Sequence, residues 1–300
     1  MSLVIGIDLG GTNIKATLID SVSRESLACL SKPTLDSEFI ASEPRFAHTV
    51  RGIVQELEAS AGQGNLRVGL SAPGLANPLG HCIDWMPGRM HGLEKLDWPT
   101  FLNREVKVIN DAHAALLGEV WVGAARDSKD AFMITLGTGV GGAIISGGRL
   151  LKGHIGRAGH LGHISVDANA QKDIFNTPGS LEYFMGNKTL QERGAGHYAN
   201  THELVAAVRA GDSTAAGLWS ESMRYLAVGL ASLINVLDPE VIILGGGIAS
   251  GAEASLLQPL QDYLDDYEWR PGGRCVRLAL ATAGEWSGCY GAARHLFLES

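Results

Sequence analysis

Apolar residues gather along this chain in short runs that end in glycine-rich turns. Residues 4–15 read VIGIDLGGTNIK: an apolar run meets an acidic residue and a glycine turn, and a second apolar run begins. A short apolar run bounded by turn residues is typical of a buried strand. Residues 134–145, which read ITLGTGVGGAII, repeat this arrangement in the second half of the chain. The repeat predicts a strand–turn–strand hairpin in each of two related halves.

The rest of the pattern alternates helices with short strands. Helical spacing of apolar residues predicts helices over residues 46–61, 112–119, 213–237, 256–267 and 288–298. Short apolar runs predict strands over residues 68–70, 106–109, 241–244 and 276–280. Residues 36–45 read as a polar loop. Residues 75–94 lack periodicity and are rich in turn residues, so they form either a binding loop or a surface loop without function.

A third glycine turn follows the strand predicted at residues 241–244, where the chain reads VIILGGGI. Consecutive glycines let backbone N–H groups approach a bulky anion, and a threonine hydroxyl adds a donor. Asp8 has the wrong charge to touch phosphate, but it suits a Mg²⁺ ion that accompanies phosphate. An ordinary hairpin turn is the alternative for the first stretch alone. Three such turns, each after a buried strand, are hard to explain by packing alone.

Composition narrows the class of protein. The 300 residues suffice for one large or two medium domains, and a hydrophobic share of 45% supplies a sizeable core. A net charge of −8 argues against a nucleic-acid surface. The four cysteines form no CxxC pair, and the first residues show no signal-peptide pattern, so we expect a cytoplasmic protein. No apolar run approaches the ~20 residues needed to span a bilayer.

With these three turns, the chain resembles the ROK family of sugar kinases, which belongs to the actin-like ATPase superfamily. The resemblance covers nearly the whole chain and is glucokinase- or hexokinase-like. It implies an α/β fold of two actin-like (RNase H-like) domains with a cleft between them. Residues 1–111 and the C-terminal helix at 288–300 would form the smaller domain, and residues 112–287 the larger.

The resemblance also implies ATP and Mg²⁺ as cofactors. Asp8 would position Mg²⁺, directly or through water. The residues implied to bind the nucleotide lie in or next to the three turns: Asp8, Gly10, Gly11, Thr12, Asn13, Lys15, Gly137, Thr138, Gly139, Gly245, Gly246 and Gly247.

A further motif follows the strand predicted at residues 106–109, where the chain reads NDAHAALLGE. An acidic residue at a strand-to-helix junction often only caps the helix by accepting backbone N–H bonds. ROK kinases carry Asn-Asp-Ala-x-Ala-Ala followed by Leu-Gly-Glu at this place. The resemblance therefore implies that Asp111 is the catalytic base and that Asn110 contacts the sugar.

Three histidines within ten residues, His154, His160 and His163, invite a metal hypothesis. The glycines between them argue for a loop, and a metal site would need further ligands nearby. ROK proteins usually read Ala-Gly-Glu-φ-Gly-His here, followed by a cysteine-rich loop that holds zinc with the histidine. In this chain Ser180 stands where one of those cysteines would be, and the other cysteines are missing. We therefore expect no zinc site.

The sugar contacts implied by the resemblance are Gly74, Asn110, His163 and Glu182, with His160 and Arg89 at two altered positions. His160 replaces a glutamate of the family, and Arg89 replaces an asparagine. Both changes move the pocket toward positive charge. The result is either a relaxed or altered hexose site, or a substrate with an anionic group near Arg89. Alternatively, Arg89 points to solvent or pairs with Asp84.

The implied function is transfer of the γ-phosphoryl group of ATP to a hydroxyl of a hexose or hexose derivative. The partners would be a small sugar, with neither nucleic acid nor membrane, and a second copy of the chain, since dimers are common in the family. A ROK transcriptional regulator would need a helix-turn-helix ahead of Val4, where only a few residues stand. A catalytically silent sugar or nucleotide sensor is the other alternative. The altered sugar ligands favour it, and Asp8, Asp111 and the three glycine turns oppose it.

Overall fold

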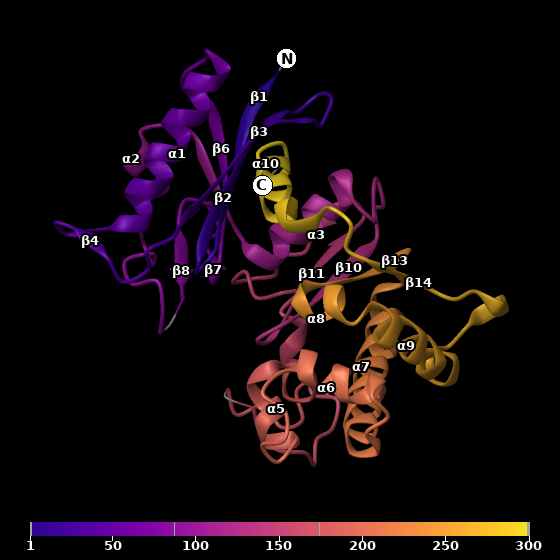
Figure 1. Ribbon diagram of the computed structural model, residues 1–300. Helices are drawn as coiled ribbons and strands as arrows, with labels where there is room; N and C mark the ends of the chain where they lie inside the picture. Colours follow the sequence, from indigo (N-terminus) through magenta and orange to yellow (C-terminus); the bar gives the residue numbers. More distant parts are fainter. Residues whose placement is uncertain (1, 87, 174, 299–300) are drawn as a thin grey trace. The chain divides into compact units, whose positions relative to one another are not determined.

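The computed structural model describes residues 2–86, 88–173 and 175–298, with only the backbone for residues 253 and 254. Residues 299 and 300, which the predicted smaller domain includes, lie outside the described residues. The chain divides into two units (Figure 1). Unit 1 comprises Met1–Asp127, Lys152–Ala158 and Thr282–Ser300, and unit 2 comprises Ser128–Leu151 and Gly159–Ala281.

Unit 1 is built on a five-stranded mixed sheet of order β3-β2-β1-β6-β9. The strands are β1 (Leu3–Leu9), β2 (Asn13–Asp20), β3 (Ser26–Pro33), β6 (Arg67–Ala72) and β9 (Val106–Asn110). The first three strands are antiparallel neighbours, whereas β6 and β9 run parallel to β1. Because carboxyl ends of parallel strands meet at one edge, the residues that follow β1, β6 and β9 come together there.

Helices cover both faces of this sheet (Figure 1). On one face lie α1 (Arg45–Ala61) and α2 (Trp98–Leu102), and on the other lie α3 (Asp111–Val122) and α10 (Ser287–His295). The residues predicted as loops contain two short hairpins, β4 (Phe39–Ile40) with β5 (Glu43–Pro44), and β7 (Leu75–Ala76) with β8 (Ile83–Trp85). Strands of two or three residues are too short to show a period in the sequence.

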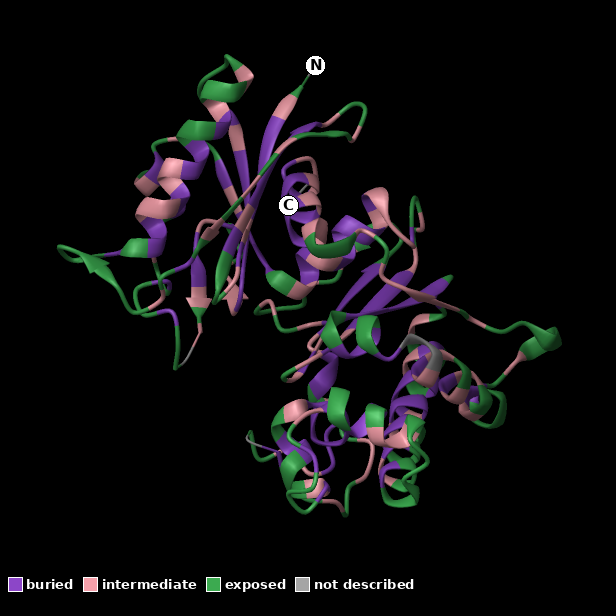
Figure 2. Cartoon of the chain, in the orientation of Figure 1, coloured by how far each residue is buried: buried purple, intermediate pink, exposed green. Residues whose placement is uncertain are grey.

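Glycines let α10 approach its neighbours at backbone distance. A Cβ on Gly6 of β1 would overlap the carbonyl group of Cys289, and one on Gly69 of β6 would overlap that of Ala292. A Cβ on Gly291 would likewise overlap the carbonyl group of Ala114 in α3. In consequence α10 is buried over much of its surface, as Figure 2 shows.

Unit 2 repeats the sheet of unit 1. Its strand order is β12-β11-β10-β13-β14, again with three antiparallel strands followed by two parallel ones. The strands are β10 (Ala131–Leu136), β11 (Val140–Ser146), β12 (Arg149–Leu150), β13 (Val241–Gly245) and β14 (Arg277–Leu280). The predicted α/β class with a repeated hairpin is confirmed.

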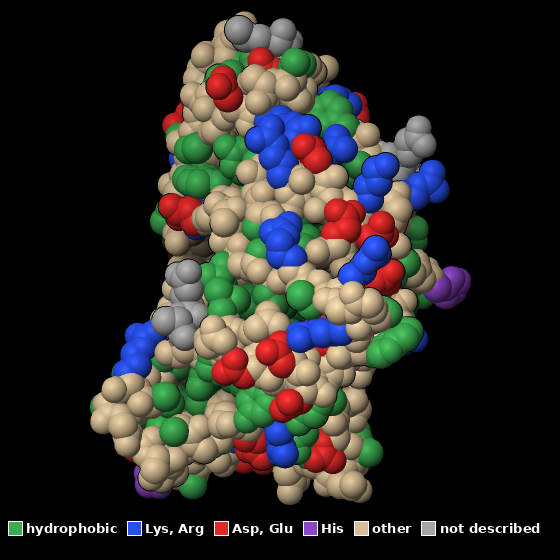
Figure 3. All heavy atoms as spheres, turned by 90° about the vertical axis from the view of Figure 1, so that its right-hand side faces the viewer, with side chains coloured by type: hydrophobic (Ala, Val, Ile, Leu, Met, Phe, Trp, Pro, Cys, Tyr) green, Lys and Arg blue, Asp and Glu red, His purple; other side chains and the backbone are tan. Residues whose placement is uncertain are grey.

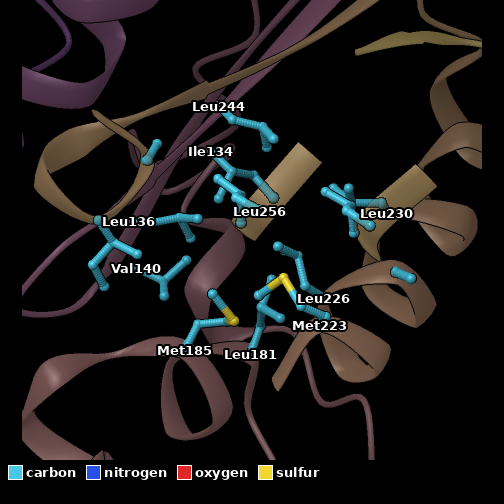
Figure 4. Close-up of a cluster of buried hydrophobic side chains, with 14 of the residues drawn as sticks. Ile134, Leu136, Val140, Leu181, Met185, Met223, Leu226, Leu230, Leu244 and Leu256 are labelled. Carbon is cyan, nitrogen blue, oxygen red and sulfur yellow. The ribbon is translucent and has the colours of Figure 1, made fainter. Parts of the chain in front are cut away.

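The core of unit 2 lies between this sheet and its long helices. Figure 4 shows Ile134 and Leu244 of the sheet pointing toward Leu226 and Leu230. The helices are α4 (Leu181–Met185), α5 (Asn187–Arg193), α6 (Thr201–Arg209), α7 (Ser213–Leu237), α8 (Gly246–Gly251) and α9 (Glu253–Tyr267). The pattern predicted α7 and α9, whose apolar positions recur over several turns. It missed α4, α5 and α6, which have nine residues or fewer.

The third glycine turn follows its predicted strand and leads directly into a helix. Residues 245–247 form a strand-to-helix junction, because β13 ends at Gly245 and α8 begins at the next residue. Gly246 has a φ of 86°, a left-handed conformation that strains any residue with a Cβ.

Within the described residues, no helix has the length and hydrophobicity needed to cross a membrane. On the face drawn in Figure 3, basic and acidic side chains are interspersed.

Candidate active site

Asp8 is the acidic side chain on the strands at the carboxyl edge of the unit 1 sheet. It faces Ser71 of the neighbouring strand β6, whose hydroxyl donates to Asp8 Oδ1 at 2.8 Å. The pKa of Asp8 is raised to about 6, chiefly by burial and in part by the negative charge of Asp111. The Ser71 hydroxyl and the positive charge of Lys15 act in the opposite direction. A carboxylate held so far above its ordinary pKa favours a nearby cation.

The turn after Asp8 is braced from outside the hairpin. The Thr34 backbone N–H donates to the carbonyl oxygen of Thr12 at 2.9 Å, and its hydroxyl donates to that of Gly10 at 2.6 Å. Thr34 is fully buried, yet nothing in the pattern around it distinguishes it from a loop threonine. Sequence reasoning therefore missed the residue that fixes the first glycine turn.

Lys15 lies across the hairpin from Asp8. Its Nζ donates to Glu285 Oε2 at 2.8 Å and lies 5.9 Å from the ring centroid of Trp286. Glu285 and Trp286 belong to the 3₁₀ turn η3 (Gly284–Trp286). This turn lies in the C-terminal segment Thr282–Ser300, which belongs to unit 1. The lysine predicted to contact the nucleotide thus already has a carboxylate partner.

Asn110 is the N-cap of helix α3, and Asp111 Oδ1 also accepts the backbone N–H of Ala112 at 2.8 Å. Asn110 Oδ1 accepts from the backbone N–H groups of Ala112 at 3.0 Å and His113 at 3.2 Å. Its amide nitrogen donates to the carbonyl oxygen of Gly74 and to Asp111 Oδ1, both at 2.9 Å. The buried asparagine therefore holds the exposed Asp111 carboxylate and ties it to the segment after β6. The structure brings Gly74, Asn110 and Asp111 together as one group.

Arg89 shares no contact with Gly74, Asn110 or Asp111 among those that the structure gives. It is exposed, and the structure gives Asp84 a different partner, since Lys95 Nζ lies 2.8 Å from Asp84 Oδ1. The alternative that Arg89 pairs with Asp84 is therefore wrong. Of the two alternatives to a substrate contact, exposure to solvent fits the structure.

In unit 2, Glu182 lies directly against the second glycine turn. It comes from the first turn of α4, is 9% exposed, and accepts the backbone N–H of Val140 at its Oε2 (3.0 Å). A Cβ on Gly139 would come within 2.5 Å of the same oxygen. Asn187 and Lys188 at the start of α5 donate their backbone N–H groups to the carbonyl oxygens of Gly137 and Thr138 (3.1 and 3.2 Å).

The second and third glycine turns meet at one edge of the unit 2 sheet. Strands β10 and β13 are parallel neighbours that pair Thr135 with Gly245. A Cβ on Gly246 would overlap the backbone of Leu136, so the α8 junction packs against the end of β10 at backbone distance. Gly247 is exposed in the first turn of α8.

His163 ends the 3₁₀ turn η1 (Leu161–His163), which His160 precedes. Its Nδ1 lies 4.0 Å from Asp173 Oδ2, and its ring meets that of Phe175 edge-on with centroids 5.0 Å apart. Asp173 Oδ1 accepts the backbone N–H groups of Phe175 and Thr177 at 2.8 and 3.0 Å. Burial raises the pKa of Asp173, but the Ser180 hydroxyl and these two N–H groups outweigh it and hold the pKa below its ordinary value.

Comparison with known proteins decides the family. The model of the ROK family matches residues 4–298.

The chain belongs to the ROK family.

A glucokinase from Thermotoga maritima is 30% identical over 285 residues, which cover 88% of this chain and 87% of the relative. A ROK hexokinase structure from Thermus thermophilus has a TM-score of 0.86 and 30% identity, and covers 97% of both chains. A ROK glucokinase from Streptomyces griseus, solved with glucose and AMPPNP, has a TM-score of 0.74 and 27% identity, covering 97% of this chain and 98% of that one.

The kinase relatives span nearly the whole chain, so this ROK protein is a glucokinase-like sugar kinase. Its fold is the one expected from the resemblance, an actin-like α/β fold with two mixed sheets.

The loop around Asp173 contains no cysteine, and its polar side chains form hydrogen bonds with its own backbone. Asp173 uses one oxygen on backbone N–H groups, and Ser180 Oγ accepts the backbone N–H of Tyr183 at 3.1 Å. The four cysteines are free and lie elsewhere in the sequence. The part of the chain that the structure describes contains no group of three or more His, Cys, Asp and Glu side chains placed to hold a metal ion. Hydrogen bonds around Asp173 hold this loop beside His163.

Proposed function

We propose that this ROK sugar kinase transfers the γ-phosphoryl group of ATP to a hydroxyl group of a hexose or hexose derivative, with Asp111 as the general base. The arrangement of Asn110 and Asp111 carries this proposal. An exposed carboxylate is held by a buried, fully hydrogen-bonded asparagine and therefore has one preferred orientation toward an acceptor. The glucose and AMPPNP named for the Streptomyces griseus relative support a hexose and an ATP-like nucleotide as the two ligands.

In the proposed step, the hydroxyl oxygen forms a bond to the γ-phosphorus while the bond from that phosphorus to the bridging oxygen of ADP breaks. The hydroxyl proton passes to the Asp111 carboxylate. Such a base contributes on the order of 10²–10⁴-fold to the rate. Most of the remaining catalysis in phosphoryl transfer comes from positioning and charge neutralisation.

Asp8 fits a role in holding Mg²⁺. Mg²⁺ keeps several of its waters and is usually bound by one or two carboxylates together with substrate phosphates. The carboxylate of Asp8 has a raised pKa and lies in the field of Asp111, so a cation would relieve both its burial and this repulsion. When bound, the metal would neutralise charge on the phosphoryl oxygens. We propose that the backbone N–H groups of the glycine turns contact the phosphates, with Asn13 and Lys15 beside them.

The proposed sugar contacts are Gly74 and Asn110 in unit 1 and His160, His163 and Glu182 in unit 2. Asp173 would fix the ring of His163, because its carboxylate lies nearest to Nδ1 and leaves Nε2 for a hydroxyl group. Arg89 has no carboxylate partner in the described residues, so it remains available to an anionic group on the substrate.

The test is coupled ADP release with Mg-ATP against hexoses, N-acetylhexosamines and anionic sugars, comparing the wild type with Asp111→Asn. We expect turnover with at least one sugar and a fall in kcat of about 10²–10⁴-fold in the variant. Asp97→Asn is the matched control: Asp97 also opens a helix of unit 1, but as its N-cap, a role in which asparagine serves equally well. Full activity in Asp111→Asn would exclude it as the base. Sugar binding without turnover in the wild type would favour the sensor instead.

A further inference from the structure

Unit 1 contains a cavity of about 150 Å³ beside the end of β9. Its polar lining comes from several elements: Asn77 after β7, His113 of α3, His295 of α10, and Lys152 and His154 of the segment that returns to unit 1. Among the residues that the structure describes, the lining includes no aspartate or glutamate.

His295 is one of three deeply buried polar residues in this lining, with His113 and Asn110. It is 5% exposed, and its Nδ1 has no hydrogen-bond partner in the described part of the chain. Burial, together with the nearby charges of Lys152, Lys107 and His113, lowers the pKa of His295 to about 3. A buried polar atom without a partner costs stability unless a ligand or a water supplies one.

Lys152 brings a positive charge into the same cavity. It is half-buried, and burial together with the charge of Lys107 lowers its pKa. Lys107 Nζ donates to the carbonyl oxygen of Leu298 at 3.2 Å. Within residues 2–86, 88–173 and 175–298, neither lysine forms an ion pair with a carboxylate. Two lysine charges therefore lie near His295, whose imidazole is neutral above a pKa of about 3, and no carboxylate of the described lining compensates them.

We propose that this cavity is a binding site for a small oxyanion, either a phosphate group or a carboxylate. An oxyanion supplies what the lining lacks, since it carries negative charge and offers several acceptor oxygens to the lysine and the imidazoles. A cavity of about 150 Å³ accepts a molecule the size of benzene, so a phosphate group fits. The oxyanion would be either a free ion or the anionic group of a sugar derivative. Asn110 also lines one wall, but the proposal rests on Lys152 and His295, which the proposed phosphoryl transfer does not use.

Thermal unfolding without nucleotide or Mg²⁺ tests the site. Sodium phosphate is titrated against sodium chloride at equal ionic strength, with the wild type, Lys152→Gln and Lys129→Gln. Lys129 is an exposed lysine of unit 2 and serves as the matched control. We expect a saturable rise in Tm with phosphate in the wild type and the control. Loss of one charge-assisted hydrogen bond should weaken the apparent affinity of Lys152→Gln about 10–100-fold.

A second arm identifies the source of the anion. Glucose 6-phosphate, glucuronate and uncharged glucose are titrated in the same way. A Lys152-dependent rise with inorganic phosphate identifies a free oxyanion. A Lys152-dependent rise with only the charged sugars identifies an anionic sugar derivative. Either supports the proposal. A rise of equal size in Lys152→Gln would place the phosphate elsewhere, such as at the glycine turns, and would overturn it, as would no saturable rise in either arm.

Histidine NMR provides a readout that does not depend on Lys152→Gln folding normally. The imidazole nitrogen signals of His295, assigned with a His295→Gln variant, should shift as phosphate or the charged sugar saturates the wild type. Unchanged His295 signals at saturation would contradict the site even if Tm rises. Neither measurement depends on catalysis. Failure of the proposed anion site can therefore be distinguished from failure of the proposed kinase activity.

Discussion

The hairpins of the two units share a backbone and differ in chemistry. In unit 1, β1 pairs with β2 and runs parallel to β6, and in unit 2, β10 pairs with β11 and runs parallel to β13. At equivalent places Asp8 faces Ser71, whereas Thr135 faces Gly245. One sheet edge thus presents a carboxylate with a raised pKa, and the other presents a neutral, glycine-lined surface.

The same difference extends across each hairpin. Opposite Asp8 lies Lys15, and opposite Thr135 lies Gly141. The charged groups that phosphoryl transfer needs are therefore available in the unit 1 hairpin. The turn of unit 2 contributes backbone groups and the neighbouring Glu182. We infer that both hairpins offer backbone N–H groups to phosphate, and that the unit 1 hairpin adds the charged groups of the proposed transfer.

The largest expected effect is on activity. Asp8→Asn should lower kcat/KM about 10²–10³-fold, the usual loss when one electrostatic group that stabilises the transition state is removed. Thr135→Val, at the equivalent place in unit 2, should change kcat/KM less than about tenfold, because that place carries no charge. Steady-state kinetics at several Mg²⁺ concentrations checks both. Equal losses in the two variants would mean that the hairpins contribute alike.

Asp8 supports activity, but we expect its charge to reduce the stability of the folded protein. Its pKa is 3.8 in the unfolded chain and about 6 in the folded one, so between these pH values the folded state binds more protons. Stability contributed by this group is therefore lost as pH rises from about 4 to 6. The deficit at pH 8 is at most about 3 kcal/mol, since the side chain keeps some solvent access.

Asp8→Asn removes this deficit. Without Mg²⁺ or nucleotide, the variant should be more stable than the wild type by up to about 3 kcal/mol at pH 8, and the gain should shrink toward zero near pH 4. Urea unfolding at the two pH values measures it. Asp97→Asn is the control of opposite sign, because hydrogen bonds from Thr100 lower the pKa of Asp97. A gain that does not vary with pH would show that the Asp8 charge is not its source.

Local sequence patterns predicted most of the elements compared above. Short apolar runs and glycine turns predicted both hairpins, and the long helices α1 and α7 showed their buried faces as a clear period. The proposed roles of Asp111 and Asn110 came from a motif whose residues are adjacent in the chain. The structure adds that the asparagine is the cap and the aspartate is exposed, which no pattern of residue types distinguishes.

Contacts between distant segments were not predictable in this way. Gly6 and Gly69 are needed because the backbone of α10, more than 200 residues later, lies against them. Thr34 and Asp173 act through hydrogen bonds to backbone atoms of turns, which leave no trace in periodicity. The cavity at His295 likewise combines segments from four parts of the chain. Each of these features depends on which backbone lies beside which side chain.

A moderate effect should follow from a single methyl group in the unit 2 turn. Gly139→Ala would press its Cβ against Glu182 Oε2 and displace the carboxylate from the Val140 N–H. A buried N–H left without its acceptor costs about 1–3 kcal/mol, and we expect that loss in urea unfolding. Gly137→Ala is the matched control in the same turn, because a Cβ there meets no atom within 4 Å. Equal stability of the two variants would show that the Glu182 hydrogen bond does not stabilise this turn.

The smallest effect concerns the ion pair that distinguishes the unit 1 hairpin. Lys15 and Glu285 are 25% and 66% exposed, so Glu285→Gln should cost less than about 1 kcal/mol of stability, and less still in 1 M salt. The variant leaves the positive charge of Lys15 less compensated. Since this charge lowers the pKa of Asp8, the pH range over which Asp8 reduces stability should move below pH 6. Urea unfolding between pH 4 and pH 8 measures both quantities. An unchanged pH dependence would mean that the charge of Lys15 does not affect the pKa of Asp8, which burial and Ser71 would then determine. Lys15 would in that case support the hairpin only through its contact with the η3 turn.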